Sequence, residues 1–487
     1  MKAFGKILLF ACALAVLGSC VKDDAAENAR LREAYTKQYV NQFAYGALSV
    51  YYLWIDEIRE NLAGWMSDDD PKAKVLEVRY KDASGKDIDR WTQVTDDYET
   101  FIKSVENVSK TYGYEFRLFY TTSEKSYLGA AVEFVYADSP AEKAGLKRGD
   151  FITEINGSPI PAESYKEIVK KQLLGSASCT LGLHDGRTVT MEAVEMYCDP
   201  VHITKVFDCG GKKVGYLHFT AFTLNARADL IKACTALKAK GISELILDLR
   251  YNGGGYVETE ELLASMLAPS AIVDAGDVFM TEIYNSLLTA AWGEDEGVSH
   301  FRNKFQIGSA TTSTAEANLG ISKLYVIMTG DSASASEALV CGLKPLMDVE
   351  IVGEQSYGKY CSGLIIEGAD WYNNYKKSLS TSDYKNGVKY AANWGIYVMI
   401  GRYADRDGNT PCMPDGFAPD HFVADNPFDG HQLGDPDESM LKAALTLAGY
   451  PYPVESASAV AKKKPALEGP ASPKRESFGV FLRRQII

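Results

Sequence analysis

The sequence predicts a multidomain chain of mixed α/β and α+β class, with a helical N-terminal domain, a β-rich domain and an α/β core. The prediction comes from the spacing of apolar residues, which is helical up to about residue 114 and strand-like from about 115. From about residue 200, strands alternate with helices, as in a parallel α/β core. The length of 487 residues suits roughly three domains of about 150 residues each. The net charge of −14 argues against a nucleic-acid partner, which needs a basic face.

Residues 1–19 read as a signal peptide, because two lysines precede an apolar run at 7–17 that is too short to span a bilayer. Leu17-Gly18-Ser19-Cys20 resembles a bacterial lipobox, which implies cleavage before Cys20 and acylation of its thiol, palmitate included. Lys22-Asp23-Asp24 resembles the surface-export signal of lipoproteins in the Bacteroidota. We therefore expect a cell-envelope protein lipid-anchored to the outer membrane, on its periplasmic face or the cell surface. The alternative is an ordinary signal peptide followed by a chance cysteine.

Residues 20–114 are predicted to form a linker and the helical domain. Tyr35, Tyr39 and Phe43 recur at helical spacing, and the aromatic run at 51–55 is expected to continue that helix into a small core. Thr95-Asp96-Asp97 is typical of a helix start, with a hydroxyl cap followed by acidic residues in the first turn.

Residues 115–197 contain strand-like segments, a short helix ended by Gly145, a Gly149-Asp150 turn and an Asn156-Gly157 turn. This order resembles a PDZ domain, which captures an extended peptide by strand addition and holds its carboxylate with backbone N–H groups. By this resemblance, Tyr127, Leu128, Gly129 and Ala130 form the carboxylate loop, and the strand from Ala131 and Val132 to Val135 receives the peptide. The alternative is a module that only packs against its neighbours.

The predicted core, residues 198–453, carries strands at 214–219, 244–250 and 323–328, with helices at 225–240 and 257–266 between them. Residues 394–400 are a further strand, and the Asp405–Asn409 segment reads as a hairpin turn rather than a calcium loop, because its glycine stands at the fourth position instead of the sixth. Residues 454–487, which contain Lys462-Lys463-Lys464-Pro465, are expected to be a disordered basic tail.

Ser334 and Lys359 are the residues best placed for chemistry. A nucleophilic serine needs a base and donors for the oxyanion. Ser334 stands among small residues just before an apolar helix, where the Ala335 N–H can donate to developing negative charge. A second donor is expected from the glycine run that follows Asn252. A lysine base must be neutral, and the aromatic and apolar residues around Lys359 predict a buried site that lowers its pKa.

Other chemistries lack their signatures. Phosphate and dinucleotide loops and the GxSxG motif are absent, and the six histidines suggest no triad. The nine cysteines include no CxxC pair, so we expect no metal and no cofactor. The cysteines beyond the leader and the lipidation site are expected to be buried apolar residues, at positions 179, 198, 209, 234, 341, 361 and 412.

Four separated segments together resemble the C-terminal processing peptidases, or tail-specific proteases. They are Leu247–Gly255, Ser332–Glu337, Val352–Lys359 and Gly416-Phe417-Ala418-Pro419-Asp420. The resemblance implies a peptidase core of the ClpP/crotonase-like spiral type behind the PDZ domain. It also implies Ser334 as nucleophile and Lys359 as general base, with oxyanion N–H groups from Gly254 and Ala335, and Gly255 as the next candidate. Glu337 is carried over as a structural residue.

One position departs from that pattern. The family often has a glutamine four residues after the lysine, where this chain has Gly363, so we expect Ser362 or Ser332 to orient Lys359 instead. The predicted function is a serine endopeptidase that cuts polypeptides captured by free apolar C-termini. The alternatives are a catalytically impaired peptide-binding envelope lipoprotein and acyl-thioester chemistry on a related core. The oligomeric state is left open.

Overall fold

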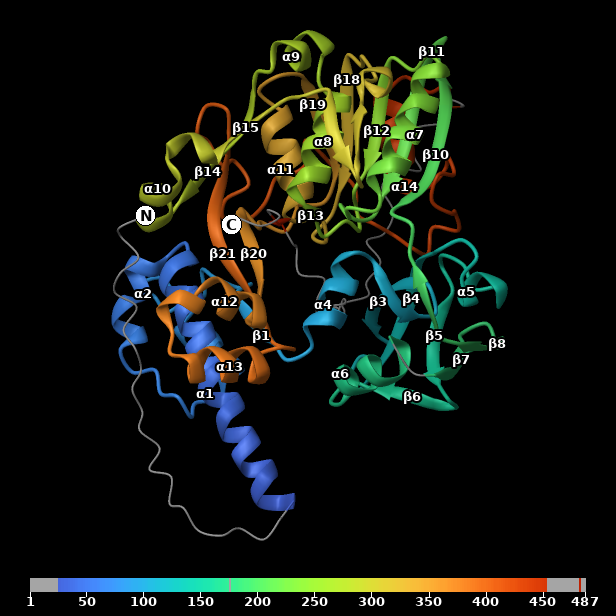
Figure 1. The fold of residues 1–487 in the computed structure, drawn as a ribbon. Helices are drawn as coiled ribbons and strands as arrows, with labels where there is room; N and C mark the ends of the chain where they lie inside the picture. Colours follow the sequence, from blue (N-terminus) through green and yellow to red (C-terminus); the bar gives the residue numbers. More distant parts are fainter. Residues whose placement is uncertain (1–24, 175–176, 453–480, 483–487) are drawn as a thin grey trace.

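The computed structural model describes residues 25–174, 177–452 and 481–482. Figure 1 shows three parts: a helical part at lower left, a β-rich part at lower right and an α/β part above them. This arrangement confirms the predicted fold class. The predicted leader with Cys20, and the predicted tail except for residues 481–482, lie outside the described residues.

The helical part combines the start of the chain with a segment from much later in the sequence (Figure 1). Its helices are α1 (Ala25–Tyr51), α2 (Ile55–Leu62), α3 (Pro71–Val78), α12 (Gly368–Asn374) and α13 (Thr381–Tyr390). They share one apolar core, in which Phe43, Trp65, Trp371 and Tyr372 are buried. The helix predicted from residue 25 is present. Its continuation to residue 55 is wrong, because the Leu53 N–H donates instead to the Met399 carbonyl of a neighbouring strand, at 2.8 Å.

A connecting segment links the helical part to the β-rich part. It contains β1 (Gln93–Thr95), α4 (Tyr98–Val105) and β2 (Val108–Thr111). The predicted helix start is confirmed, but the predicted hydroxyl cap is wrong. The cap of α4 is the Asp97 carboxylate, which accepts a hydrogen bond from the Thr100 N–H at 3.1 Å, while Thr95 lies in β1.

The β-rich part is an antiparallel sheet of strand order β3-β4-β6-β5-β7-β8. The elements are β3 (Tyr114–Tyr120), β4 (Tyr127–Val135), α5 (Pro140–Lys143), β5 (Phe151–Ile155), β6 (Ser158–Pro161), α6 (Tyr165–Ile168), β7 (Ser178–Leu183) and β8 (Thr188–Glu192). Alternate residues such as Phe116, Leu118 and Ile152 form its own core. Outside this sheet, β9 (Val194–Tyr197) pairs with β2.

The α/β part contains a six-stranded sheet of order β10-β11-β12-β18-β19-β22. From β11 onward the strands are parallel, as predicted. The strands are β10 (Val201–Cys209), β11 (Lys212–Phe219), β12 (Glu244–Asp248), β18 (Lys323–Met328), β19 (Asp348–Gly353) and β22 (His421–Phe422). The associated helices are α7 (Arg227–Ala239), α8 (Val257–Leu267), α11 (Ala335–Leu343) and α14 (Ser439–Leu447). Since β12 and β18 are almost wholly buried, both read as continuous apolar runs.

A second sheet runs from the α/β part down to the helical part, through the long strand β21 (Figure 1). Its order is β13-β23-β20-β21-β14-β15, and β1 also pairs with β21. Its bounds are β13 (Gly255–Tyr256), β14 (Val278–Tyr284), β15 (Val298–His300), β20 (Cys361–Glu367), β21 (Gly395–Asp405) and β23 (Phe481–Leu482). The remaining helices and strands of this region are α9 (Ser270–Ala275), α10 (Ser286–Trp292), β16 (Lys304–Ile307) and β17 (Ala310–Ser313). Contrary to the predicted disordered tail, residues 481–482 form a strand.

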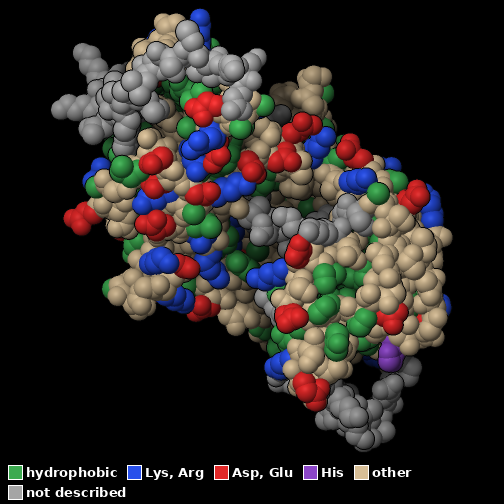
Figure 2. All heavy atoms as spheres, turned by 90° about the horizontal axis from the view of Figure 1, so that it is seen from below, with side chains coloured by type: hydrophobic (Ala, Val, Ile, Leu, Met, Phe, Trp, Pro, Cys, Tyr) green, Lys and Arg blue, Asp and Glu red, His purple; other side chains and the backbone are tan. Residues whose placement is uncertain are grey.

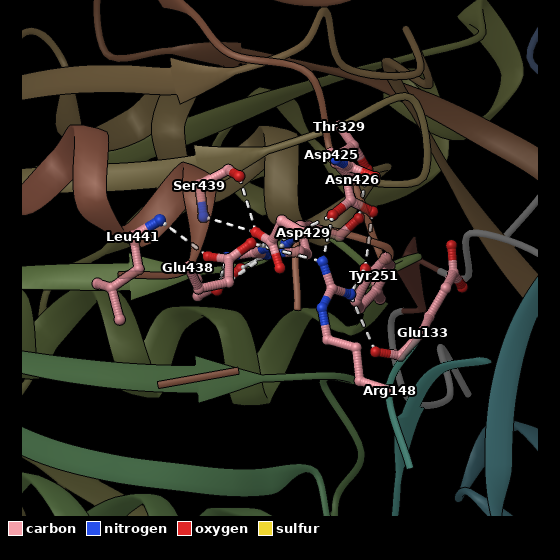
Figure 3. Close-up of polar contacts among 12 residues, drawn as sticks. Glu133, Arg148, Tyr251, Thr329, Asp425, Asn426, Asp429, Glu438, Ser439 and Leu441 are labelled. Atoms are coloured by element: carbon pink, nitrogen blue, oxygen red, sulfur yellow. Dashed lines mark hydrogen bonds and ion pairs between the residues drawn. The ribbon is translucent and has the colours of Figure 1, made fainter. Parts of the chain in front are cut away.

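A buried polar cluster joins the β-rich part to the α/β part (Figure 3). Arg148, from the turn before β5, donates to Asp425 at 2.9 Å and to the Tyr251 hydroxyl at 2.7 Å. Arg250, just after β12, donates to Glu438 at 2.6 Å. Burial opposes the negative charge of Asp425. The arginines 148, 117 and 250 nevertheless hold the pKa of Asp425 well below its ordinary value. The cluster therefore connects the β-rich part to the segment that leads into the glycine loop.

Seen from below (Figure 2), acidic and basic side chains are interspersed over the helical lobe at left, while hydrophobic side chains gather on the β-rich lobe at right. This face therefore presents no uniformly basic surface, in line with the negative net charge. Within the described ranges, no helix is long and apolar enough to cross a bilayer. The seven cysteines predicted to be buried are buried.

Candidate active site

Ser334 stands at the junction between strand and helix. The chain leaves β18 at Met328 and enters α11 at Ala335, which leaves Ser334 as the residue just before the helix, as predicted. Its backbone has φ +60° and ψ −113°, a conformation that costs a non-glycine residue of order 1–3 kcal/mol. Its Oγ is buried and has no hydrogen-bond partner within the described part of the chain. The hydroxyl is thus available to a base.

The glycine loop packs directly against this serine. The Asn252 carbonyl accepts hydrogen bonds from the Ala333 N–H at 3.1 Å and from Ser336 Oγ at 2.9 Å. A Cβ added at Gly254 would lie 2.9 Å from the Ser334 Cβ. Gly254 also has φ +105°, so both space and conformation require glycine here.

The predicted oxyanion donors are only partly in place. The Gly254 N–H donates to the Asn252 side-chain oxygen at 2.9 Å, so the prediction that it faces a substrate carbonyl is wrong for this structure. The physical reason is a local turn in which Asn252 binds the backbone two residues on. The Ala335 N–H lies in the first turn of α11, where helix N–H groups lack an intrahelical acceptor. Gly255 begins β13, and its donor role stays a prediction.

Lys359 is completely buried, as predicted. Burial lowers its pKa from the ordinary value to about 7, so a large fraction of the amine is neutral near neutral pH. Its Nζ donates a hydrogen bond to the Tyr397 hydroxyl at 2.8 Å. The Nζ also lies 4.9 Å from the centroid of the Tyr397 ring and 5.6 Å from that of the Trp91 ring. An aromatic pocket therefore encloses the amine.

Glu337 ties the serine and the lysine together. One oxygen of its buried carboxylate accepts hydrogen bonds from the Ser334 N–H at 3.0 Å and from the Lys359 N–H at 2.8 Å. The other oxygen accepts from Ser356 Oγ at 2.5 Å and from the Gly358 N–H at 2.7 Å. Burial raises the pKa of Glu337 in spite of these donors. The shared oxygen fixes the backbones of Ser334 and Lys359 next to each other.

Neither serine proposed to orient the lysine does so. Ser332 Oγ donates to the Leu249 carbonyl at 2.7 Å, and Ser362 Oγ to the Gly401 carbonyl at 3.4 Å. Both hydroxyls donate to backbone oxygens of other segments. The contacting residue is Tyr397, which sequence reasoning missed because it lies on the neighbouring strand β21. Tyr403, also from β21 and also missed, donates to the Lys359 carbonyl at 2.7 Å.

The predicted peptide-binding segment of the β-rich part is wrong. Tyr127, Leu128, Gly129 and Ala130 form no loop, because they are the first half of strand β4. This strand is internal: Ala130 and Ala131 pair with β3 on one side and with β5 on the other. The Val132 N–H also donates to the Asp150 carbonyl at 2.9 Å. Since both edges of β4 are occupied, these residues cannot receive a peptide strand.

Within the described ranges, no group of three or more His, Cys, Asp or Glu side chains is arranged to hold a metal ion. The histidines are placed elsewhere as well. His202 and His218 share a hydrogen bond of 2.8 Å between their Nδ1 atoms. The side chain shown to bind the Ser334 backbone is the carboxylate of Glu337, which also binds the Lys359 N–H.

Comparison with known proteins agrees with this geometry. Residues 213–423 match the family model for peptidase family S41, and residues 132–171 match that for the PDZ domain. The chain is similar to a carboxyl-terminal-processing protease of Picosynechococcus sp., with 25% identity over 319 residues that cover 63% of this chain and 64% of that protein. It is also similar to the chloroplastic carboxyl-terminal-processing peptidase 1 of Arabidopsis thaliana, with 29% identity over 238 residues, 46% of this chain and 42% of that protein.

The matched segments span less than two thirds of each of these relatives. Among solved structures, an S41 protease from Bacteroides fragilis superposes with a TM-score of 0.62 at 21% identity, over 83% of this chain and 96% of that one. This likeness shows the shared fold.

Proposed function

We propose that this chain is a serine endopeptidase of the C-terminal processing type, because residues 213–423 match the model for peptidase family S41 and residues 132–171 match that for the PDZ domain. Ser334 is the nucleophile and Lys359 the general base. The observation that carries the proposal is the Glu337 carboxylate, which binds the backbone N–H groups of both residues through one oxygen. Two groups far apart in sequence are thereby held as one unit, as a nucleophile and its base must be.

The reaction follows from the protonation state of the lysine. With a pKa of about 7, a neutral Lys359 amine is present at working pH and takes the proton from Ser334 Oγ as it attacks the substrate carbonyl. The C–N bond breaks, an ester forms on Ser334, and the proton passes to the leaving amine. Water then cleaves the ester with the same lysine as base. The Ala335 N–H at the start of α11 supports the developing oxyanion.

The backbone around the site supports binding of an extended polypeptide. Strand β23 pairs in parallel with Gly255 and Tyr256 of β13 on one side and with Gly363 of β20 on the other. An extended segment therefore fits between the glycine loop and the strand that follows the lysine. We expect substrates to lie there by strand addition, with backbone hydrogen bonds that tolerate many sequences.

We assign capture of the substrate C-terminus to strand β3, which forms the edge of the β-rich sheet next to β4. Strand β3 is terminal in the strand order and, within the described residues, pairs only with β4. Gly113, with φ +79°, directly precedes it and permits a tight turn there. We expect the peptide to add to β3, with a preference for a free apolar C-terminus. Amidation of that C-terminus is expected to weaken binding, and equal affinity for both forms would argue against this assignment.

Peptide cleavage tests the proposal directly. The purified chain is incubated with an unstructured polypeptide ending in apolar residues, beside Ser334→Ala and Lys359→Ala. Cleavage by the wild type alone supports the Ser334–Lys359 dyad, and equal cleavage by all three proteins contradicts it. If the wild type binds the polypeptide without cutting it, the chain is a peptide-binding protein instead.

We also propose that the chain is acylated at Cys20 and anchored to the outer membrane of the cell envelope, on the evidence of the lipobox-like sequence alone. Metabolic labelling with a palmitate analogue is expected to mark the wild type and not Cys20→Ser. Protease treatment of intact cells then distinguishes display at the cell surface from the periplasmic face.

A further inference from the structure

The pocket around Lys359 contains an interaction that the proposed dyad does not account for. We propose that Tyr397 is the positioning residue of the lysine base, and that the lack of a side chain at Gly363 makes room for it. The inference rests on the proposed function, because it concerns how Lys359 is aimed. It follows from one hydrogen bond, one steric relation and the burial of both side chains.

The hydrogen bond connects Tyr397 directly to the Lys359 amine. Lys359 Nζ donates to the Tyr397 hydroxyl at 2.8 Å, and the exposed fractions of the two residues are 0% and 1%. A neutral amine that donates one N–H to this hydroxyl keeps its lone pair free for the Ser334 proton. Because the pocket excludes water, the hydroxyl replaces the solvent that would otherwise bind the amine.

The steric relation explains why Tyr397 reaches the lysine. Strands β20 and β21 are antiparallel, and Tyr397 is paired with Ile365, two residues beyond Gly363. A Cβ added at Gly363 would lie 2.3 Å from the Tyr397 Cε2 and 2.6 Å from its Cζ. The Tyr397 ring thus lies directly over the bare backbone of Gly363. Any larger residue there would displace the ring and with it the hydroxyl.

The remaining contacts locate the amine and name the charges that face it. The Trp91 ring, from the segment before β1, lies on the amine together with the Tyr397 ring. The titratable and charged groups that act on Lys359 are Cys361, Asp89, Glu337 and Arg90. Of these, Glu337 is held by its four donors and Arg90 stacks on Trp91 at 4.9 Å. Tyr397 is the residue whose polar atom bonds the Nζ itself.

The first test removes only the hydroxyl. The rate at which a fluorophosphonate labels Ser334 is measured from pH 5 to 9 for the wild type, Tyr397→Phe and Tyr325→Phe. The matched control, Tyr325, is another buried tyrosine, whose hydroxyl donates to the Leu447 carbonyl at 3.4 Å, remote in the fold from the lysine pocket. Tyr397→Phe is expected to lower the plateau rate roughly 10- to 100-fold. It also moves the midpoint to lower pH, because the ammonium form loses an acceptor.

Tyr325→Phe is expected to keep both the plateau and the midpoint. If Tyr397→Phe keeps the wild-type plateau and midpoint, or loses rate with an unmoved midpoint, Tyr397 is not the positioning residue. If the wild type is not labelled, or Ser334→Ala is labelled equally, the proposed function fails instead, so the two failures are distinguishable.

The second test uses the steric relation between Gly363 and Tyr397. It compares the effect of one substitution in two backgrounds, so its outcome does not rest on any one variant being folded. Gly363→Ala is expected to slow labelling by a similar factor while Tyr397 is present, because the new Cβ displaces the ring. In a Tyr397→Ala background the same substitution is expected to have almost no further effect, since no ring is left to displace. The other atom near the new Cβ, Met399 Cε at 2.6 Å, is the flexible end of a side chain. Losses that simply multiply in the double variant would overturn the inference. Thermal unfolding of each variant identifies those that are folded.

Discussion

The pKa of Lys359 makes the pH dependence of the reaction a quantitative prediction. An ordinary lysine, with a pKa of about 10.4, would be neutral in only about one molecule in 2,500 at pH 7. With burial lowering the pKa to about 7, the neutral fraction is roughly 10% at pH 6, 50% at pH 7 and 90% at pH 8. The rate of Ser334 acylation by a small fluorophosphonate is therefore expected to rise about fivefold from pH 6 to pH 7 and to level off above pH 8.

The control for this profile is Lys359→Met, which keeps an apolar stem of similar length without the amine. It is expected to react slowly and with a flat profile over the same range. A rate that keeps rising to pH 10 would show that the lysine has its ordinary pKa. An unchanged midpoint in Lys359→Met would assign the titration to another group.

The same shift affects stability, and its sign can be worked out. Between about pH 7 and pH 10 the unfolded chain binds a proton at Lys359 that the folded chain does not, so the free energy of unfolding rises with pH. The slope from this group is at most about 1.4 kcal/mol per pH unit. Urea unfolding at several pH values is expected to show this contribution in the wild type and its loss in Lys359→Met.

Three further predictions concern the residues that hold the site and the domain junction. Glu337→Gln keeps the shape but removes the charge that four donors share, so acylation is expected to fall about 100-fold. Its pH midpoint is expected to move to lower pH, because the Glu337 charge raises the pKa of Lys359. A loss under threefold would contradict the bridging role of Glu337. Arg148→Met leaves Asp425 with one guanidinium fewer and is expected to lower the free energy of unfolding in urea by about 3–5 kcal/mol. An unchanged free energy of unfolding would show that the cluster does not stabilise the fold. Above its unfolded pKa of about 3.9, Asp425 contributes stability, and this contribution is lost as the pH falls further. Asp425→Asn is therefore expected to have a lower melting temperature at neutral pH. Its melting temperature is also expected to depend less on pH in the acid range.

Local sequence predicts the parts of the site that depend on neighbouring residues. Small residues followed by an apolar run place Ser334 at the start of α11, and the apolar surroundings of Lys359 predict its burial. Both features arise within a few positions of the residue concerned, where helix starts and hydrophobic patterning are readable.

The features that sequence reasoning missed depend on pairing between distant segments. Tyr397 reaches Lys359 only through the register of β20 and β21, and a shift of one residue would turn its ring to the opposite face. The peptide-binding prediction failed for the same reason, because a strand at an edge and a strand inside a sheet have similar sequences. At Gly254, a side chain two residues away took the N–H that an unbound glycine loop would have offered.

The site concentrates groups that are each unfavourable alone. Ser334 has a strained backbone, Lys359 is a buried amine whose charge is suppressed, and Glu337 is a buried carboxylate whose pKa is raised. Around them, Gly363 is a strand glycine that leaves space against an aromatic ring. These features support one another. The Glu337 carboxylate needs hydrogen-bond donors, and the backbone at Ser334 and in the turn before Lys359 supplies them. The Lys359 amine needs a polar partner, and the absence of a side chain at Gly363 leaves room for Tyr397. Strain and burial at these positions are therefore better explained as the conditions of a working nucleophile and base than as features of a packing core, which would favour apolar residues at all three positions.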